Sequence, residues 1–475
     1  MLMRDYDFGM IGLGVMGQNL LFNMADKGFS VIGYDKLEEK ALALESGATA
    51  NTLVKGVTEL QEMIDGLSLP RRIMMLVPAG KIVDDVIAEL LPLLAPGDIV
   101  IDAGNSFYKD TVRRVQYLKE HDIHFMGMGI SGGEKGARYG ASLMPGGDRT
   151  AYNHVHNLLQ AVAAEVNGEA CTAYMGNGAA GHYVKMVHNG IEYAMMQIIS
   201  EVYDILKNGL QLHNRQIHEV FKKWNEGRLQ SYLVQITADI FLKKDEFTSA
   251  DLVDMILDKA GSKGTGKWTS QEAMDIYISI PTIDTAVSMR MLSWQKEERV
   301  LASKLYAFPA TVIDTNDQDV FIDKLEDALY VAFIICYAQG LTMLQKASAE
   351  YSMDIPLKDV VKIWRGGCII RSLLLEDFYQ AFVKDNDMTN ILLDKNIANL
   401  ISPRMEAFRE VVAKAVMASI ASGGLQNTLA YIENYASEKM PTNLIQAQRD
   451  YFGAHQYERI DREGMFHTDW DSLNF

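Results

Sequence analysis

The sequence predicts an α/β domain with a mostly parallel sheet, followed by a large all-α domain and a C-terminal tail. Two observations support this prediction. As far as a glycine-rich segment at 176–181, apolar strand-like runs alternate with amphipathic helical segments, which is typical of a parallel sheet covered on both faces. Beyond that segment the apolar residues recur with helical spacing. We therefore expect domains at 1–177 and 178–432, and a tail at 433–475.

Length and composition indicate a soluble globular protein of two or three domains. The chain has 475 residues, of which 48% are hydrophobic and 23% are charged. Its formal net charge of −17 argues against nucleic acid or an anionic membrane as a partner. A small anionic substrate is not excluded, since a few local arginines and lysines suffice to hold a phosphate.

The cysteines and the N-terminus predict a cytoplasmic protein. Cys171, Cys336 and Cys368 show no paired spacing, which indicates reduced thiols rather than disulfides. The chain starts with charged residues where a signal peptide requires an apolar run. We expect no membrane-spanning helix, because no run reaches the ~18 apolar residues that such a helix needs.

A glycine-rich turn near the N-terminus predicts a Rossmann-like dinucleotide-binding domain. It follows an apolar strand at 6–11 and precedes a helix that ends at Gly28, and the next strand, at 30–34, is followed by an acidic residue. A GxGxxG motif alone is weak evidence, but this position between strand and helix makes it strong. The first two glycines let the backbone approach a pyrophosphate, and the third allows close helix–strand packing. The expected cofactor-binding residues here are Gly12, Leu13, Gly14, Val15, Met16, Gly17, Tyr34, Asp35 and Lys36.

The later strands indicate further ligand-binding loops. Apolar runs at 72–77, 98–102 and 123–127 predict strands, with a helix at 83–94 between the first two. In open parallel sheets, ligands bind at the loops that follow the strands. The alternative for each loop is an ordinary βα turn, which also favours glycine, asparagine and serine. The loops contain Val77 and Ala79, then Asn105, and then Ser131, Gly132 and Gly133.

Four polar residues on one predicted helix face are the clearest sign of chemistry. Lys185, His188, Asn189 and Glu192 follow each other at i, i+3, i+4 and i+7, so they share one face. Such groups cost stability when they are buried without partners. A solvated helix face is the alternative, but the flanking residues are apolar and the usual mixture of Glu and Lys is missing. We therefore favour a catalytic face that lines a cleft.

Three other segments interrupt the helical pattern. A glycine-rich loop at 263–268 carries two lysines and a threonine, which suits oxyanion or sugar binding but lacks the spacing of a nucleotide P-loop. The segment 364–371 is interpreted as a helix interruption packed by Trp364. The tail contains more aromatic residues than a disordered segment would have, so we expect it to dock on its own chain or on a neighbour.

With these motifs in place, the chain resembles the decarboxylating 6-phosphogluconate dehydrogenases over essentially its whole length. The loop at 263–266 and the tail are specific to that family, whereas the glycine fingerprint and the helix face are shared with wider β-hydroxyacid dehydrogenases. The resemblance implies oxidation of carbon 3 of 6-phosphogluconate by NAD or NADP, loss of CO₂, and protonation of the enediol to ribulose 5-phosphate in the pentose phosphate pathway. No metal is expected. The motifs that carry the resemblance lie at 12–19, 101–106, 131–134, 185–193, 258–268 and 441–455.

The same resemblance implies roles for individual residues. Lys185 matches the family's general base and Glu192 its acid. A lysine base must be neutral, so its usual pKa of about 10.4 has to be lowered by burial or by a nearby cation. In the family the tail threads into the partner subunit, which implies a homodimer with shared active sites. The expected substrate ligands are Asn105, Ser131, Gly132, Gly133, His188, Asn189, Tyr193, Lys263, Thr265, Arg290, Arg449 and His455.

The chain departs from the family pattern after the second strand. NADP-using members have Asn-Arg-Thr or a similar sequence there, and this chain has Asp35-Lys36-Leu37. A carboxylate suits hydrogen bonds from the ribose 2′-hydroxyl of NAD and repels the 2′-phosphate of NADP. Lys36 can still pair with that phosphate. We expect a preference for NAD, or use of both cofactors.

Two alternatives are open. Another β-hydroxyacid dehydrogenase, acting on a smaller acid without phosphate, shares the fingerprint and the helix face but does not need Lys263, Arg290 and Arg449 as a phosphate clamp. A non-catalytic sugar-phosphate sensor is the second alternative. Lys185 and Glu192 argue against a sensor, because binding alone needs neither a base nor an acid.

Overall fold

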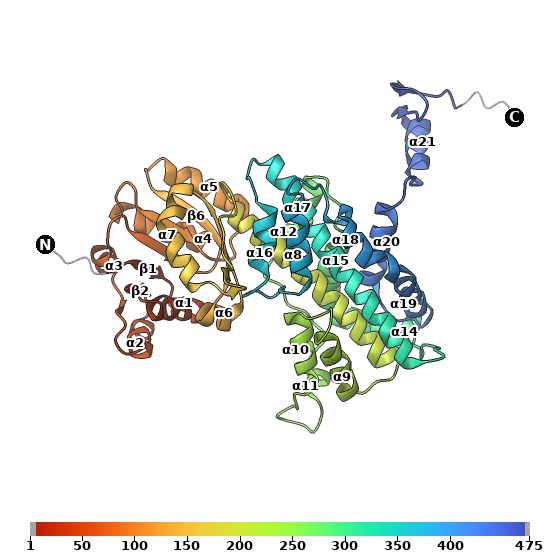
Figure 1. Ribbon diagram of the computed structural model, residues 1–475, viewed down its shortest axis with the longest axis horizontal. Helices are drawn as coiled ribbons and strands as arrows, with labels where there is room; N and C mark the ends of the chain where they lie inside the picture. The colour runs from red at the N-terminus through yellow and green to blue at the C-terminus, as the bar shows by residue number, and fades with distance from the viewer. Residues whose placement is uncertain (1–5, 471–475) are drawn as a thin grey trace. The chain divides into compact units, whose positions relative to one another are not determined.

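The computed structural model describes residues 6–470 and divides the chain into two compact units, with the division between Thr428 and Leu429. The first unit contains a sheet domain and a helical domain, and the second contains the C-terminal segment (Figure 1). The predicted fold class is confirmed: a Rossmann-like α/β domain is followed by a large helical domain.

The sheet has the strand order β3-β2-β1-β4-β5-β6-β7, in which the first six strands run parallel and β7 is antiparallel to β6. Its strands are β1 (Phe8–Ile11), β2 (Val31–Tyr34), β3 (Val54–Val57), β4 (Arg72–Met75), β5 (Ile99–Asp102), β6 (His124–Ser131) and β7 (Ser142–Gly147). The accompanying helices are α1 (Val15–Asp26), α2 (Glu38–Gly47), α3 (Leu60–Gly66), α4 (Lys81–Leu90), α5 (Tyr108–Lys119), α6 (Gly133–Tyr139) and α7 (Arg149–Val162). A small hairpin of β8 (Glu165–Val166) and β9 (Glu169–Ala170) follows.

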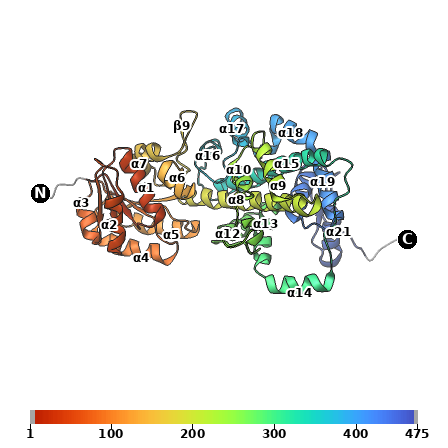
Figure 2. The same cartoon turned by 90° about the horizontal axis from the view of Figure 1, so that it is seen from below.

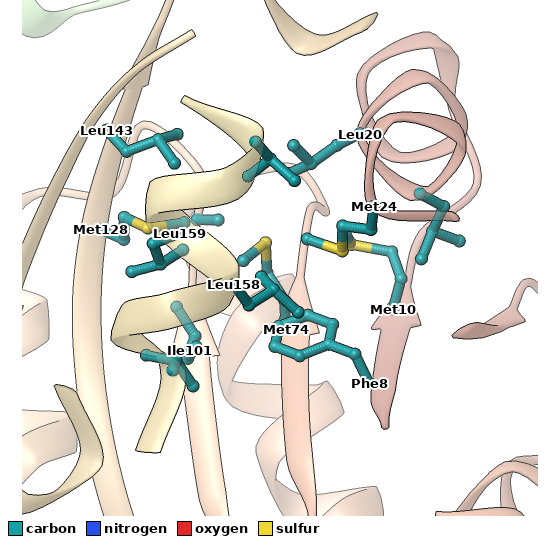
Figure 3. Packing of buried hydrophobic residues seen from close by; sticks show 14 of the residues in the cluster. Phe8, Met10, Leu20, Met24, Met74, Ile101, Met128, Leu143, Leu158 and Leu159 are labelled. Atoms are coloured by element: carbon teal, nitrogen blue, oxygen red, sulfur yellow. The ribbon is translucent and has the colours of Figure 1, made fainter. Parts of the chain in front are cut away.

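Side chains from alternate strand positions form a core on each face of the sheet. On one face, Phe8, Met10 and Met74 pack with leucines and methionines of α1 and α7 (Figure 3). On the other face, Ile11 and Met75 pack with residues of α3, α4 and α5. Because both faces are covered, these strands consist of nearly continuous apolar runs.

Within the seven-stranded sheet, two strands lie outside the set that the sequence predicts, β3 and β7. β3 is a short edge strand that contains Lys55 and Gly56, so its apolar pattern is weak. β7 contains Pro145 and two glycines, which indicate a loop. Proline is tolerated in β7 because this strand lies at the edge of the sheet, where a ladder N–H is not needed.

The helical domain is built around α8 (Ala180–Asp204) and α15 (Gln318–Glu350). Figure 2 shows α8 leaving the sheet domain and running through the helical domain, where it packs against α15, α12 and α13. The other helices are α9 (Asn214–Asn225), α10 (Tyr232–Ile240), α11 (Leu252–Met255), α12 (Thr265–Asp275), α13 (Pro281–Ser293), α14 (Lys296–Tyr306), α16 (Leu357–Trp364), α17 (Leu374–Lys384), α18 (Lys395–Ile401), α19 (Met405–Met417) and α20 (Gly423–Tyr435).

The expectation that no stretch is apolar enough to span a membrane needs correction at α15. This helix passes that test by length and composition. In the structure 89% of its most apolar window is buried inside the protein. Its apolar character is therefore accounted for by contacts with α8, α13 and α19 in the middle of the domain.

Glycines let α8 lie directly against β6 and β7. A Cβ on Gly129 would come within 2.3 Å of the Lys185 Cβ, and one on Gly181 within 2.1 Å of the Gly127 carbonyl oxygen. A Cβ on Gly146 would come within 2.2 Å of the Gly181 nitrogen. A larger residue at any of these positions would push the helix away from the sheet, so the glycines set where the predicted catalytic face lies.

The second unit is ordered around one carboxylate. It contains α21 (Thr442–Gly453) and a hairpin of β10 (Tyr457–Glu458) and β11 (Met465–Phe466). The buried Asp450 accepts hydrogen bonds from Gln456 N at 2.9 Å, His467 Nδ1 at 2.9 Å and Trp470 Nε1 at 2.8 Å. These bonds hold its pKa far below the ordinary value, although burial acts in the opposite direction. The segment thus has a local fold of its own.

Candidate active site

The polar face of α8 is buried rather than solvated. Lys185 is 7% exposed and His188 is fully buried, while the side chain of Glu192 is 21% exposed. The helix packs tightly against its neighbours. Gly129 of β6 lies against the Lys185 side chain, and Gly190 of α8 lies against Thr269 of α12, which leaves no room for solvent at these contacts. The structure therefore excludes the solvated helix face as an explanation of this pattern.

Burial moves the pKa values of the predicted base, Lys185, and the predicted acid, Glu192, toward each other. It lowers the pKa of the Lys185 ammonium, and the nearby Glu192 carboxylate raises it part of the way back. It raises the pKa of Glu192, with Lys185 and Arg290 acting in the opposite direction. The low dielectric penalises both charged forms. Both shifts favour the uncharged forms, a neutral Lys185 and a protonated Glu192, which are the forms that a base and an acid require.

His188 connects the helix face to the loop after β6. Its Nε2 lies 3.1 Å from the Ser131 Oγ, and its Nδ1 lies 3.2 Å from the Asn189 Oδ1. Burial lowers the pKa of His188 well below its ordinary value, and the Lys185 charge adds to this effect. A neutral imidazole with both nitrogens engaged suits a residue that positions Ser131 and Asn189.

The loop after β6 is shaped by two glycines with positive φ. Gly132 has φ +127° and Gly133 has φ +61°, which other residues adopt only with strain. A Cβ on Gly132 would come within 2.5 Å of the Gly367 carbonyl oxygen. The segment 364–372 thus supports the Ser131 loop from behind, and Ile369 N lies 3.4 Å from the Ser131 Oγ. The sequence suggested only a helix interruption for this segment.

Three of the predicted phosphate ligands come together at the far end of the α8 face. The Arg290 guanidinium carbon lies 3.4 Å from the centre of the Tyr193 ring, and its Nη1 donates to the Gly261 carbonyl at 3.1 Å. Thr265 begins α12, and a Cβ on the adjacent Gly266 would touch the Tyr193 ring. Stacking and the carbonyl fix the plane of the guanidinium, which prepares it for a bidentate anion.

Other predicted substrate residues are less defined. Lys263 is exposed on the loop before α12. Arg449 and His455 are exposed in the second unit, so their place in the active site stays a prediction. Asn105 is exposed at the end of β5, where Asp102 anchors its loop by accepting hydrogen bonds from Gly104 N and Ser106 Oγ.

The three glycines of the fingerprint loop have different surroundings, and these fit the binding of a dinucleotide. A Cβ on Gly12, which has φ +96°, would come within 2.5 Å of the Leu76 carbonyl oxygen, and one on Gly17 within 2.0 Å of the Gly12 carbonyl oxygen. A Cβ on Gly14 would meet nothing within 4 Å. Gly12 and Gly17 are thus required by the protein, whereas the space beside Gly14 at the start of α1 is where a pyrophosphate fits.

A cavity of about 580 Å³ adjoins this loop at the ends of β1, β2 and β4. Asp35 stands at its wall and accepts hydrogen bonds from Leu13 N at 2.9 Å and Leu37 N at 3.1 Å. Of the predicted cofactor residues, Val77 is half-buried at the cavity wall, and Val15, Lys36 and Ala79 are exposed. The lining residues are Ile11, Gly12, Tyr34, Asp35, Lys36, Leu60, Val77, Pro78, Ile82, Asp85, Val86, Ala88 and Glu89.

Glu272 holds the helical domain to the sheet domain and was not found from the sequence. Its buried carboxylate accepts hydrogen bonds from the Tyr108 hydroxyl at 2.5 Å and the Tyr351 hydroxyl at 2.6 Å. Tyr108 belongs to α5 and Glu272 to α12, whose first residue is Thr265. The contact therefore sets the position of the predicted phosphate loop. An isolated Glu in an amphipathic helix carries no sequence signal of this role.

A dinucleotide-binding sheet beside a helix that carries a buried lysine and a partly buried glutamate is the arrangement of a nicotinamide-dependent hydroxyacid dehydrogenase. Two family models match the chain: the NAD binding domain of 6-phosphogluconate dehydrogenase at residues 7–177, and the C-terminal domain of 6-phosphogluconate dehydrogenase at residues 181–470. The chain belongs to the 6-phosphogluconate dehydrogenase family.

Similar proteins cover the chain from end to end. A relative from Bacillus subtilis (strain 168), named as NADP(+)-dependent and decarboxylating 6-phosphogluconate dehydrogenase, is 47% identical over 98% of this chain and 100% of its own length. The decarboxylating enzyme of Lactococcus lactis subsp. lactis is 46% identical over 98% of this chain and 99% of its own. The solved structure of the Plasmodium falciparum enzyme superposes with a TM-score of 0.95 at 44% identity, covering 98% of this chain and 100% of that one.

The lowered pKa of Lys185 predicts how the stability of the protein depends on pH. Because its pKa is lowered in the folded state, the unfolded chain binds the proton more readily, and stability rises with pH toward the ordinary lysine pKa of about 10.4. We expect Lys185→Met to raise the midpoint of thermal unfolding at pH 7, and this gain to shrink as the pH approaches that value. Calorimetry of the variant and the unmodified protein at pH 7 and at a pH nearer the lysine pKa measures this gain. The matched control is the exposed Lys222→Met, and a gain that does not depend on pH would contradict the argument.

Proposed function

We propose that the protein oxidises and decarboxylates 6-phosphogluconate to ribulose 5-phosphate and CO₂ with reduction of a nicotinamide dinucleotide, as a cytoplasmic enzyme of the pentose phosphate pathway. The observation that carries the proposal is the buried pair of Lys185 and Glu192 on one helix, with pKa values shifted toward each other in a member of this family. A smaller acid without phosphate is disfavoured, because the stacked Arg290 beside Tyr193 and Thr265 has no use for such a substrate.

The first step needs a base at the carbon-3 hydroxyl. Neutral Lys185 accepts that proton. A nicotinamide dinucleotide held beside the Gly12–Gly17 loop would supply the acceptor for the hydride that leaves the same carbon. The ammonium that results lies in a buried site, where its charge stabilises the negative oxygen that develops at carbon 3 when the carboxylate leaves as CO₂. One residue thus acts first as a base and then as an electrostatic stabiliser.

The second step needs an acid that protonates the enediol at the carbon that becomes carbon 1 of ribulose 5-phosphate. Glu192 lies two turns along α8 from Lys185, so the two groups reach opposite ends of a short substrate segment. Its raised pKa keeps the proton available for transfer to the enediol. Ser131, Gly132, Gly133, His188 and Asn189 are then positioned to hold the carboxylate end, and Tyr193, Lys263, Thr265 and Arg290 to hold the phosphate.

Glu192→Gln tests the division of labour between the two groups. The amide is nearly isosteric with the acid but does not transfer a proton, so we expect substrate binding to persist and formation of ribulose 5-phosphate to fall ~10²–10⁴-fold. Hydride transfer in a single turnover, followed by absorbance of the reduced nicotinamide, should fall much less. The control is Lys185→Ala, in which hydride transfer itself should be lost. Equal loss of both signals in Glu192→Gln would remove it from the acid role.

For the cofactor we propose NAD, or use of both NAD and NADP. Asp35 points its carboxylate at the loop where the adenosine ribose fits, and Lys40 lies 3.3 Å from it. Lys36 is 3.0 Å from Glu89, which raises the pKa of the Lys36 ammonium. A 2′-phosphate would therefore meet one carboxylate directly and would have to compete with another for Lys36. This proposal differs from the cofactor in the name of the Bacillus subtilis relative.

Glu89→Gln tests whether Glu89 withholds Lys36 from the cofactor. We expect kcat/KM with NADP to rise by up to about fivefold, because an exposed ion pair is worth at most about 1 kcal/mol, and kcat/KM with NAD to stay unchanged. Asp35→Asn with Lys36→Arg should move preference further toward NADP. The matched control is Glu62→Gln, which breaks the exposed pair with Lys55 of the edge strand β3, outside the residues that line the cavity. A strong NADP preference in the unmodified protein would overturn the proposal.

We further propose a homodimer in which the tail of one chain completes the active site of the other. The tail has a local fold and exposes a row of apolar side chains, which indicates a surface made to be covered. Arg449 and His455 are exposed on the same segment. The row consists of Leu444, Ile445, Tyr451 and Phe452.

Mixed dimers test the tail exchange. Arg449→Ala should weaken substrate binding by about 1.5–3 kcal/mol, because a charge-assisted contact is lost. When Arg449→Ala chains are mixed with Lys185→Ala chains, heterodimers should regain one intact site in two. At substrate concentrations that leave the Arg449→Ala protein largely unsaturated, they should therefore be more active than either parent. The control is each variant mixed with itself. If verified heterodimers show no rescue, each chain uses its own tail.

A further inference from the structure

A second cavity lies outside the proposed active site. Its volume is about 410 Å³, within the range of small-molecule sites. It is bounded by the β8–β9 hairpin, the start of α10 and the segment 364–372, and most of the residues that line it have polar side chains. The lining residues are Val166, Asn167, Asn225, Gln230, Ser231, Tyr232, Gln235, Arg365, Arg371, Ser372, Leu373 and Glu376.

Arg371 gives this cavity a positive charge. Its guanidinium carbon lies 4.0 Å from the centre of the Tyr232 ring, and its Nη1 donates to the Cys368 carbonyl at 3.0 Å. Within residues 6–470, no carboxylate forms an ion pair with it. The neighbouring Arg365, by contrast, is neutralised by Glu169 and Glu376. Arg371 is therefore held in a fixed plane with unused N–H groups beside hydroxyls and amides, which is the chemistry that recognises an oxyanion.

We propose that this cavity binds a small anionic metabolite through its phosphate or carboxylate group, with Arg371 as the principal ligand. Ser231 and Ser372 are joined across the cavity wall by backbone pairing, so the occupant meets a preformed site. The acidic side chain in the lining, Glu376, is 2.7 Å from Arg365. This ion pair offsets the charge of Glu376 and reduces its repulsion of an anion.

Occupancy of the cavity acts on the proposed active site through the segment 364–372. Arg371 and Ser372 face the cavity, whereas Gly367 and Ile369 of the same segment contact the Ser131 loop. Trp364 lies edge-on to the His188 ring, with centroids 5.7 Å apart. An anion that fixes this segment therefore favours the arrangement of Ser131 that holds substrate, and lowers KM for 6-phosphogluconate without changing kcat.

Calorimetric titration of the full chain tests the site directly. The protein is saturated with 6-phosphogluconate in the absence of a nicotinamide cofactor and titrated with inorganic phosphate and, separately, with citrate. We expect one site per chain for at least one probe, with affinity reduced about tenfold or more in Arg371→Gln. The difference between the probes distinguishes a phosphate from a carboxylate site. Arg215→Gln, at an exposed arginine of α9, is the matched control.

Gln235→Glu covers the case in which Arg371→Gln fails to fold. This exposed residue lines the cavity, and a carboxylate there should also weaken anion binding. The bound probe should lower KM for 6-phosphogluconate in the unmodified protein and not in Arg371→Gln. Absence of binding by both probes, equal binding in Arg371→Gln, or an equal KM response in the two proteins would overturn the proposal. The titration needs no turnover, so it remains informative if the protein lacks the proposed activity.

Discussion

The close contact of α8 with strands β6 and β7 is the constraint on which the rest of the structure depends. It exists because Gly127 and Gly129 of β6, Gly146 of β7 and Gly181 of α8 have no side chains of their own to separate the helix from the strands. One helix therefore carries Lys185 and Glu192, the proposed base and acid, and also joins the two domains of the first unit. The loop that follows β6 lies beside the same helix, so the distance between Ser131 and His188 is set by backbone packing rather than by flexible side chains.

Burial has different consequences at the Lys185 end and at the Arg290 end of the α8 face. Around Lys185 burial disfavours the charged ammonium and lowers its pKa, as the proposed role of a base requires. At the phosphate end the guanidinium of Arg290 keeps part of its surface open and gains its orientation from the ring of Tyr193. Burial also lowers the pKa of Arg290, but a guanidinium stays charged at any ordinary pH. A gradient from a dry reacting end to a wetter binding end follows from the position of α8 in the fold.

Local support comes from residues to which the sequence motifs assign no role. Glu272 joins α5 to α12, Asp450 organises the tail, and the buried Glu201 accepts hydrogen bonds from Gly424 N and Leu425 N at the start of α20. Each is a single carboxylate whose partners are distant in the chain or are backbone groups. The segment 364–372 belongs with them, since the sequence suggested only a helix interruption and the structure places it behind Ser131.

The sequence by itself determined the fold class, the glycine fingerprint and the shared face of Lys185, His188, Asn189 and Glu192, because period and spacing along the chain set these features directly. It missed β3 and β7, because Lys55 and Gly56 in β3 and Pro145 with two glycines in β7 weaken the apolar strand pattern, and both strands lie at sheet edges. Whether that helix face is buried, which pKa values shift, and which loop stands behind Ser131 was decided by tertiary structure alone. These properties depend on contacts between segments far apart in the chain, and no local pattern encodes such contacts.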